Sequence, residues 1–261
     1  NDFEVGNRHN LERVIVMNPD ATMNSNALQY QGMSREMCRE ELLKDLEKAG
    51  LLISVEPMVH SVGHSERTGV MVEPYLSKQW FVKMRGLADR VLENQANKDT
   101  KVNFVPEYYE KTMNHWMEIT YDWCISRQLW WGHRIPAYYE KALLAETGAE
   151  NYPEDKIIVA PNIEAAAAKS GLSVEELVQD EGALDTWFSS WLWPISVFDT
   201  NKAGHPEAEP NKDLSYYYPT NDLVTGPDIL FFWVARMIMA GNEFMNDVPF
   251  RNVYLTGIVR D

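Results

Sequence analysis

The fold is decided by the stretch Leu223-Val224-Thr225-Gly226-Pro227-Asp228 and the residues that follow it. Its first two residues are apolar and predict a strand, the Thr-Gly-Pro-Asp turn ends that strand, and a helix is expected from the turn to about Asn242. A second strand is predicted over residues 252–259. Strands joined by such a helix lie parallel in one sheet, so the turn after the first strand borders a ligand crevice. The predicted fold class is therefore α/β.

The turn itself is the strongest candidate site in the sequence. Pro227 suits the first helical position, and Gly226 lets a ligand approach the backbone closely. The carboxylate of Asp228 is placed to accept hydrogen bonds from the two vicinal hydroxyls of a ribose. An acidic residue in the first turn also stabilises a helix through the helix dipole. A purely structural interpretation of Asp228 therefore stays open at this point.

The helix after the turn is apolar on almost every side, which is typical of a buried helix. Ile229 and Trp233 lie one turn apart, and we expect them to line a small apolar pocket beside Asp228. Such a pocket suits a branched aliphatic side chain.

The composition excludes several classes of protein. Among 261 residues, 45% are hydrophobic and 24% charged, as in ordinary globular proteins, and the net charge of −15 gives no general attraction to nucleic acid or anionic lipid. Cys38 and Cys124 form neither a disulfide framework nor a cysteine zinc site. The longest apolar run, residues 229–235, is too short to span a membrane. We expect a cytoplasmic protein, and an internal fragment because the first residue is not Met.

The first part of the chain reads as a mixed unit that ends near residue 57. A short helix is predicted from Asp2, and a second helix between its cap Ser34 and the stop signal Gly50. A strand is expected at residues 51–53. A polar, glycine-punctuated connection then marks a domain junction near residues 56–75.

The middle of the chain predicts shorter elements. A strand is expected at residues 79–82 and a helix over residues 86–93. Residues 140–182 are Ala-rich and acidic, with short helical patterns around Ala165 and Glu175. We interpret them as an insertion packed against the core.

Residues 122–134 combine two arginines, a histidine and three tryptophans. Basic groups interleaved with aromatic rings are typical of surfaces that stack on bases and contact phosphates. The alternative, with the tryptophans in a core and the arginines on the surface, stays open. His60 and His64 are spaced like metal ligands, but no third ligand is near them, so no zinc site is predicted.

Three strings carry a resemblance to a known family: residues 122–133 (DWCISRQLWWGH), 184–190 (LDTWFSS) and 225–233 (TGPDILFFW). They resemble the bacterial valyl-tRNA synthetases, a family of class I aminoacyl-tRNA synthetases. The sequence LWWGH at residues 129–133 favours this family over the isoleucine and leucine enzymes. Residues 18–33 and 60–75 are also similar to it.

The resemblance implies an organisation and an activity. Residues 1–57 would be the C-terminal part of an inserted editing domain, 58–110 a connection, and 111–261 the second half of a Rossmann-type catalytic domain. The parent enzyme would activate valine with ATP and Mg²⁺, charge tRNA(Val) and hydrolyse threonyl-tRNA. The fragment alone is expected to be inactive, because the His-Ile-Gly-His and Lys-Met-Ser-Lys-Ser motifs that act on ATP lie outside it.

The resemblance also implies site residues and partners. The implied roles are nucleotide binding by Thr225, Gly226, Asp228, Gly257 and Ile258, a valine pocket of Trp187, Ile229 and Trp233, editing by Asp2, and contact with tRNA by Arg127 and Trp131. Some family members carry cysteine zinc knuckles that this chain lacks, which again predicts no zinc. A monomer is expected. The rival prediction is a non-catalytic module that binds a nucleotide or tRNA.

Overall fold

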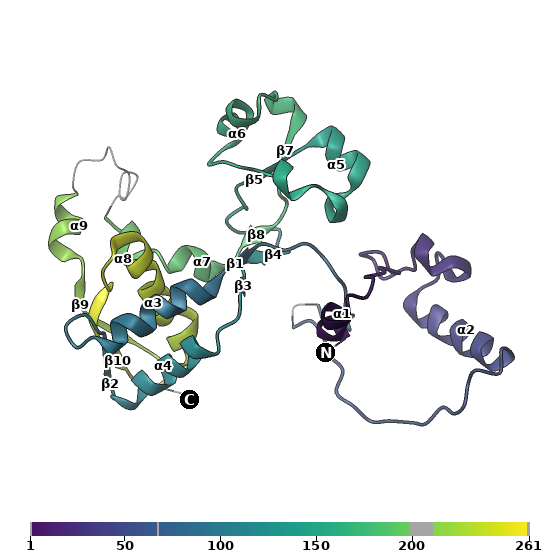
Figure 1. Cartoon of the computed structure of the whole chain (residues 1–261), viewed down its shortest axis with the longest axis horizontal. Coiled ribbons are helices and arrows are strands. Elements are labelled where there is room, and N and C mark those ends of the chain that lie inside the picture. Colours follow the sequence, from purple (N-terminus) through teal and green to yellow (C-terminus); the bar gives the residue numbers. More distant parts are fainter. Residues whose placement is uncertain (1, 67, 199–210, 260–261) are drawn as a thin grey trace. The chain divides into compact units, whose positions relative to one another are not determined.

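The computed structural model describes residues 2–66, 68–198 and 211–259. The chain divides into two compact units, Asn1–Ser77 and Lys78–Asp261 (Figure 1). Within the described ranges, no helix is long and apolar enough to cross a membrane.

The first unit is built from α1 (Asp2–His9), the 3₁₀ helix η1 (Ser25–Tyr30) and α2 (Arg35–Lys48). Both predicted helices are confirmed. The hydroxyl of Ser34 accepts a hydrogen bond from the backbone N–H of Met37 at 3.2 Å and caps α2. After its last turn, Gly50 takes the left-handed conformation with φ of 69°, which favours glycine.

The predicted strand at residues 51–53 is wrong. These residues form neither helix nor strand, and Ile53 is 99% exposed. A short apolar run becomes a strand only when a neighbouring strand takes up its backbone hydrogen bonds. No described segment of the first unit does so.

The second unit is organised by a three-stranded sheet with the order β2-β10-β9. Its strands are β2 (Asn103–Val105), β9 (Thr220–Thr225) and β10 (Phe250–Leu255). Both pairs are parallel, and the buried Val253 of β10 lies between Phe104 and Leu223. The predicted parallel α/β arrangement is confirmed. The second strand is shorter than predicted, because residues 256–259 have no strand partner and are exposed.

The connection from β9 to β10 is helical from Pro227 to Met245. It consists of the 3₁₀ turn η6 (Pro227–Ile229), the π-helical η7 (Leu230–Val234), α10 (Ala235–Ala240) and the π-helical η8 (Gly241–Met245). A Cβ at Gly241 would lie 2.6 Å from the Tyr218 hydroxyl, so the close approach requires glycine. The helix runs three residues beyond the predicted end at Asn242.

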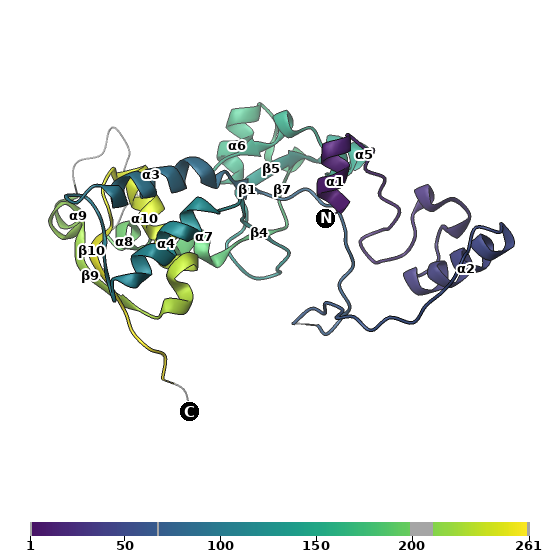
Figure 2. The same ribbon diagram turned by 60° about the horizontal axis from the view of Figure 1, so that its bottom comes forward.

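The main core forms where α10 packs with α3 (Met84–Ala96), beside α4 (Tyr108–Glu118) (Figure 2). Every residue of α10 is buried. The helix predicted over residues 86–93 is confirmed as part of α3, which buries Met84, Ala88 and Val91 along one face.

Two short antiparallel ladders lie beside this core. They pair β1 (Phe81–Val82) with β3 (Trp123–Cys124), and β4 (Ser126–Arg127) with β8 (Ala183–Leu184). The strand predicted at residues 79–82 is therefore shorter than expected. The helices that follow are α7 (Thr186–Ser190), α8 (Trp193–Ser196) and α9 (Lys212–Tyr217).

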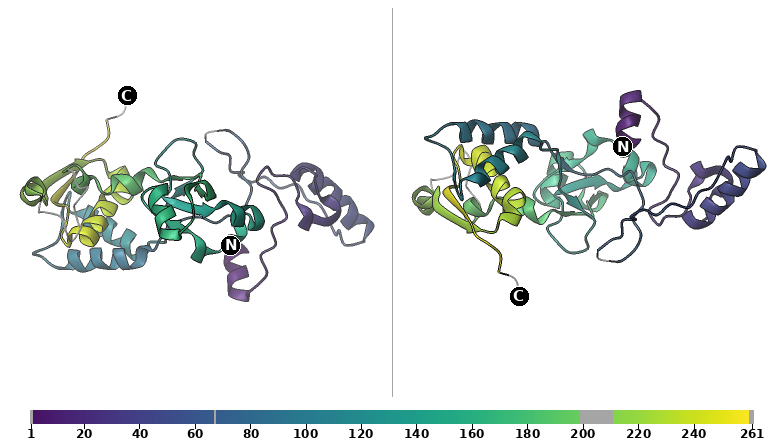
Figure 3. Two further views of the ribbon diagram at one scale, coloured as in Figure 1. Left: turned by 90° about the horizontal axis from the view of Figure 1, so that it is seen from above. Right: turned by 90° about the horizontal axis from the view of Figure 1, so that it is seen from below.

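Residues 137–179 fold as a small lobe with its own core (Figure 3). Its antiparallel sheet has the order β6-β5-β7 and consists of β5 (Ala137–Glu140), β6 (Ile158–Val159) and β7 (Leu177–Gln179). The helical elements are α5 (Lys141–Thr147), the 3₁₀ turns η2 (Ala149–Asn151) and η3 (Glu154–Lys156), α6 (Ile163–Ser170) and the 3₁₀ turn η4 (Val174–Glu176). The helical patterns predicted around Ala165 and Glu175 are confirmed by α6 and η4.

Candidate active site

The corner at the carboxyl end of β9 presents an unengaged carboxylate. Thr225 ends the strand, Gly226 has extended backbone, and Pro227 opens the 3₁₀ turn η6. Asp228 is exposed and makes no hydrogen bond or ion pair with the residues that the structure describes. The pKa of Tyr109 is raised, chiefly by a hydrogen bond to Tyr108 and in smaller part by the charge of Asp228. The carboxylate is therefore available to a ligand.

The parallel pairing brings a second predicted segment to the same corner. The backbone N–H of Thr256 donates to the carbonyl of Thr225 at 3.0 Å. A Cβ on Gly226 would lie 3.4 Å from Cγ1 of Ile258, so that side chain lies directly over the glycine. Gly257 and Ile258 are exposed. The five residues predicted to bind a nucleotide thus come from the adjacent ends of β9 and β10.

An aromatic wall lies beside this corner, where α7 packs against η7. Trp187 and Trp233 are both half-buried, and Ile229 is half-buried at the end of η6. The ring of Trp187 stacks on Phe232 with 6.1 Å between centroids, and Trp233 Nε1 donates to the carbonyl of Ser190 at 3.2 Å. The two predicted pocket tryptophans are therefore connected through the five-residue helix α7.

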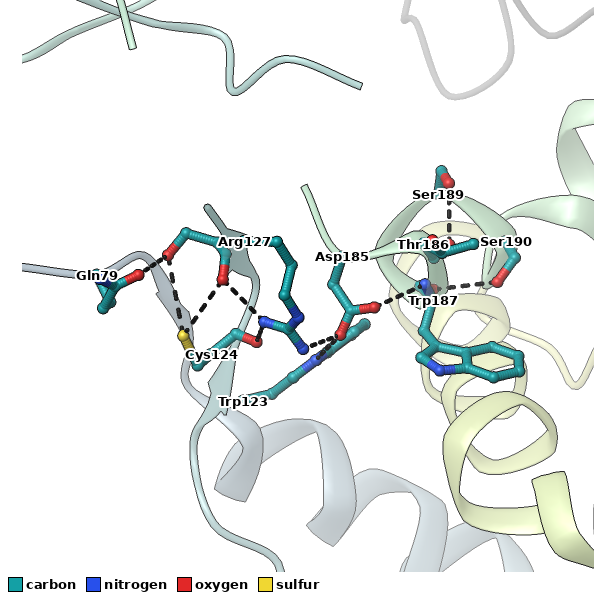
Figure 4. Close-up of polar contacts among 10 residues, drawn as sticks. Gln79, Trp123, Cys124, Arg127, Asp185, Thr186, Trp187, Ser189 and Ser190 are labelled. Atoms are coloured by element: carbon teal, nitrogen blue, oxygen red, sulfur yellow. Dashed lines mark hydrogen bonds and ion pairs between the residues drawn. The ribbon is translucent and has the colours of Figure 1, made fainter. Parts of the chain in front are cut away.

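Asp185, which the sequence analysis did not single out, holds the start of α7 (Figure 4). Its side chain is almost completely buried, at 8% exposed. One carboxylate oxygen accepts from Trp123 Nε1 at 3.0 Å and from Arg127 Nη2 at 2.6 Å. The other accepts from the backbone N–H of Trp187 at 3.1 Å and caps the helix. An aspartate immediately before Thr-Trp-Phe is a readable cap signal, but its two side-chain partners are not readable from the sequence.

Arg127, predicted to face tRNA, is engaged inside the chain. Besides Asp185, its guanidinium donates to the carbonyl oxygens of Cys124 at 2.8 Å and Ser126 at 2.9 Å. Trp131 and its neighbour Trp130 are instead 92% and 106% exposed. Of the two residues predicted to contact tRNA, Trp131 is therefore exposed to solvent, whereas the guanidinium of Arg127 already donates to three groups within the chain.

The guanidinium of Arg236 is buried against the ring of Trp123, whose Nε1 donates to Asp185. Arg236 on α10 is 5% exposed, and its guanidinium carbon lies 3.6 Å from the centre of the Trp123 ring. Its Nε and Nη1 have no hydrogen-bond partner in the described structure. Burial lowers the pKa of Arg236 to about 10, while Asp185 acts in the opposite direction. The group remains positively charged at neutral pH.

Comparison with known proteins identifies the family. The model of the class I tRNA synthetases (I, L, M and V) matches residues 1–261. The chain is a member of the class I tRNA synthetases.

Valine–tRNA ligases are among the similar proteins. That of Lactobacillus acidophilus is 55% identical over 261 residues and that of Bacillus subtilis 55% over 266 residues, each over 100% of this chain. The chain spans 27% of the length of these relatives. The methionyl-tRNA synthetase of Mycobacterium tuberculosis bound by methionyl-adenylate is 16% identical over 78% of this chain and 31% of its own, with a TM-score of 0.43.

Two other residues considered in the sequence of this class I synthetase chain, Asp2 and His64, belong to the first unit. Asp2 is exposed in the first turn of α1, in the first unit. His64 Nδ1 lies 3.0 Å from the carbonyl oxygen of Val62. Among the described residues, no group of three or more His, Cys, Asp or Glu is arranged to hold a metal ion.

Proposed function

We propose that residues 1–261 are part of a valine–tRNA ligase, whose full-length form joins valine to tRNA(Val) with ATP. The observation that carries this proposal is the identity of 51–55% to relatives named valine–tRNA ligase over all of this chain. The exposed, unpartnered carboxylate beside an aromatic wall agrees with it, because a ribose and a small amino acid need these two surfaces side by side.

The corner would hold the adenosine of ATP. Asp228 would accept hydrogen bonds from the ribose hydroxyls, and Thr225 and Gly226 would let the sugar lie against the backbone. Gly257 and Ile258 would border the adenine, because Ile258 already covers Gly226. Both segments are parallel strand ends, where ligands of open α/β sheets bind.

Trp187, Ile229 and Trp233 would form the pocket for the valine side chain. Their half-buried, apolar surfaces suit a branched aliphatic group. Adenylate formation needs no covalent nucleophile from the protein, since the amino-acid carboxylate attacks the α-phosphate directly. The task of these residues is therefore to hold the two substrates in line.

Mg²⁺ would neutralise charge on the ATP phosphates. Among the described residues, no group of three or more His, Cys, Asp or Glu is arranged to hold a metal ion, and the ATP phosphates would supply the main ligands of Mg²⁺. No zinc site is proposed.

The domain assignment is part of the same proposal. Residues 1–57 would belong to an editing domain, 58–110 to a connection, and 111–261 to half of a Rossmann-type catalytic domain with an insertion at 140–182. An apolar pocket for valine does not strongly reject threonine, whose hydroxyl replaces a methyl, and the valine enzyme is itself the standard example of this limit. Asp2 would bind the α-ammonium of threonine during its hydrolytic removal.

Contact with tRNA would come from the loop that carries Trp131. Its exposed indole suits stacking on an unpaired base, whereas Arg127 would act only if its internal hydrogen bonds were exchanged for phosphate. We further propose a monomeric enzyme of the cytoplasm.

The decisive experiment is amino-acid-dependent pyrophosphate exchange by the full-length enzyme. We expect exchange with valine at a much higher kcat/KM than with isoleucine, leucine or methionine, the other substrates of this family. Preference for one of those three would refute the valine assignment.

The 261-residue chain is tested separately. We expect no exchange, and weak binding of a non-hydrolysable valyl-adenylate analogue that is lost in Asp228→Ala. Binding of tRNA without any response to the analogue would instead favour the non-catalytic module.

A further inference from the structure

The buried carboxylate of Asp185 connects the guanidinium of Arg127 to the start of α7, which carries Trp187 (Figure 4). Its two oxygens accept from three donors: the indole N–H of Trp123, the guanidinium of Arg127 and the backbone N–H of Trp187, the second residue of α7. We infer that Asp185 is a positioning residue that sets the shape of the amino-acid pocket. This inference rests on the proposed function.

Asp185 acts on the pocket through α7 and not through contact with a ligand. Its side chain is 8% exposed, and both oxygens are occupied by hydrogen bonds. A five-residue helix has almost no stability of its own. Asp185 fixes the first turn of α7 by accepting from the backbone N–H of Trp187. At the other end of the helix, Trp233 Nε1 donates to the carbonyl of the last residue, Ser190, at 3.2 Å. Loss of the first anchor frees Trp187 to move while the Trp233 end stays attached.

The charge of Asp185 has a second effect. Arg127 donates to it directly, and Arg236 lies over the ring of Trp123, whose Nε1 donates to the same carboxylate. Among the described residues, Arg127 pairs with no other carboxylate, and Arg236 makes no ion pair. Removing this negative charge deprives the partly exposed Arg127 of its ion-pair partner and the buried Arg236 of a carboxylate that favours its charged form, which favours local rearrangement.

The test is Asp185→Asn in the full-length synthetase, assayed by pyrophosphate exchange without tRNA. Asparagine keeps the shape but has one acceptor oxygen, so its amide faces N–H donors on one side. We expect the KM for valine to rise about tenfold or more, since small displacements of positioning groups have large effects on productive binding. The KM for ATP should change less than about twofold, because the ATP corner has no bond to Asp185.

Asp180, the residue after β7, offers a matched control. Its carboxylate accepts from Trp80 Nε1 at 3.3 Å and from the backbone N–H of Gly182 at 2.8 Å, which reproduces the indole and i+2 contacts of Asp185. Asp180→Asn should leave both KM values unchanged. An equal rise of both KM values in Asp185→Asn, or no rise in either, overturns the positioning role.

A second variant decides the matter if Asp185→Asn does not fold. Arg127→Lys keeps the positive charge but cannot reproduce the hydrogen bonds to Asp185, Cys124 and Ser126 together. We expect a smaller rise, confined to the KM for valine; an unchanged KM for valine overturns the inference. Absence of valine-dependent exchange in the unmutated enzyme would instead refute the proposed function, so the two failures are distinguishable.

Discussion

Asp228→Ala in the full-length synthetase is the most direct test of the corner. The substitution is expected to have little effect on stability, because Asp228 is exposed and has no hydrogen-bond or ion-pair partner among the described residues. Its loss should change the free energy of unfolding by no more than about 1 kcal/mol, the upper value for an acidic residue near a helix N-terminus. Folding and function are therefore separable at this position.

The expected effect on ATP is much larger. Two hydrogen bonds from ribose hydroxyls to a charged carboxylate each contribute about 1.5–3 kcal/mol. Because Asp228 is exposed, the lower value applies to both, giving about 3 kcal/mol, or roughly a hundredfold loss in kcat/KM for ATP. The KM for valine should change much less, since the carboxylate does not belong to the aromatic wall.

The assay is pyrophosphate exchange at varied ATP, with Asp155→Ala as the control. Asp155 is also exposed and is the central residue of a three-residue 3₁₀ turn, η3, in the lobe. The control should retain full activity. A folded Asp228→Ala enzyme with unchanged kcat/KM for ATP would refute the ribose role and restore the purely structural interpretation of this residue.

Three further predictions concern other parts of the chain. Asp2→Ala in the full-length enzyme should increase threonyl-tRNA, because the ammonium group loses its counter-charge; normal clearance in a deacylation assay contradicts the editing role. Gly241→Ala should destabilise the chain by about 1–3 kcal/mol in urea unfolding, because the added Cβ meets the Tyr218 hydroxyl at 2.6 Å, and unchanged stability would mean that the helix shifts freely. A hydrogen bond from Arg35 at 2.6 Å lowers the pKa of Glu36 to about 2, so its stabilising charge is complete above the ordinary value of 4.5 and is lost as the pH falls through about 2. Carboxyl NMR titration should show this, and Arg35→Gln should return the pKa towards 4.5.

Local sequence patterns correctly predicted the helices and strands whose start and end residues can be recognised within the segment itself. The helix after Ser34 has a side-chain cap and a glycine stop, and the parallel strands β9 and β10 contain apolar residues and are joined by a turn and a helix. In these segments the stabilising contacts are close in the sequence or follow from a regular period, so they can be read without a structure.

The same local signals failed where a partner was required. Residues 51–53 are as apolar as a strand, but a strand needs hydrogen bonds from a neighbour, and none is present among the described residues of that unit. The end of β10 was overestimated for the same reason, because pairing with β9 stops at Leu255. The hydrophobic pattern of a segment indicates which side chains it can bury, but it does not show whether a neighbouring strand is present to pair with it.

The sequence by itself determined the identity of the candidate corner: the turn with Asp228, the apolar residues after it, and the family they resemble. Only the tertiary structure decided how that corner is supported. Asp185 is 62 positions from Trp123, yet they share a hydrogen bond, and Arg127 is bonded inward and not free. Such contacts depend on the packing of distant segments, because a hydrogen bond is set by distance and direction in space, which sequence spacing alone does not contain.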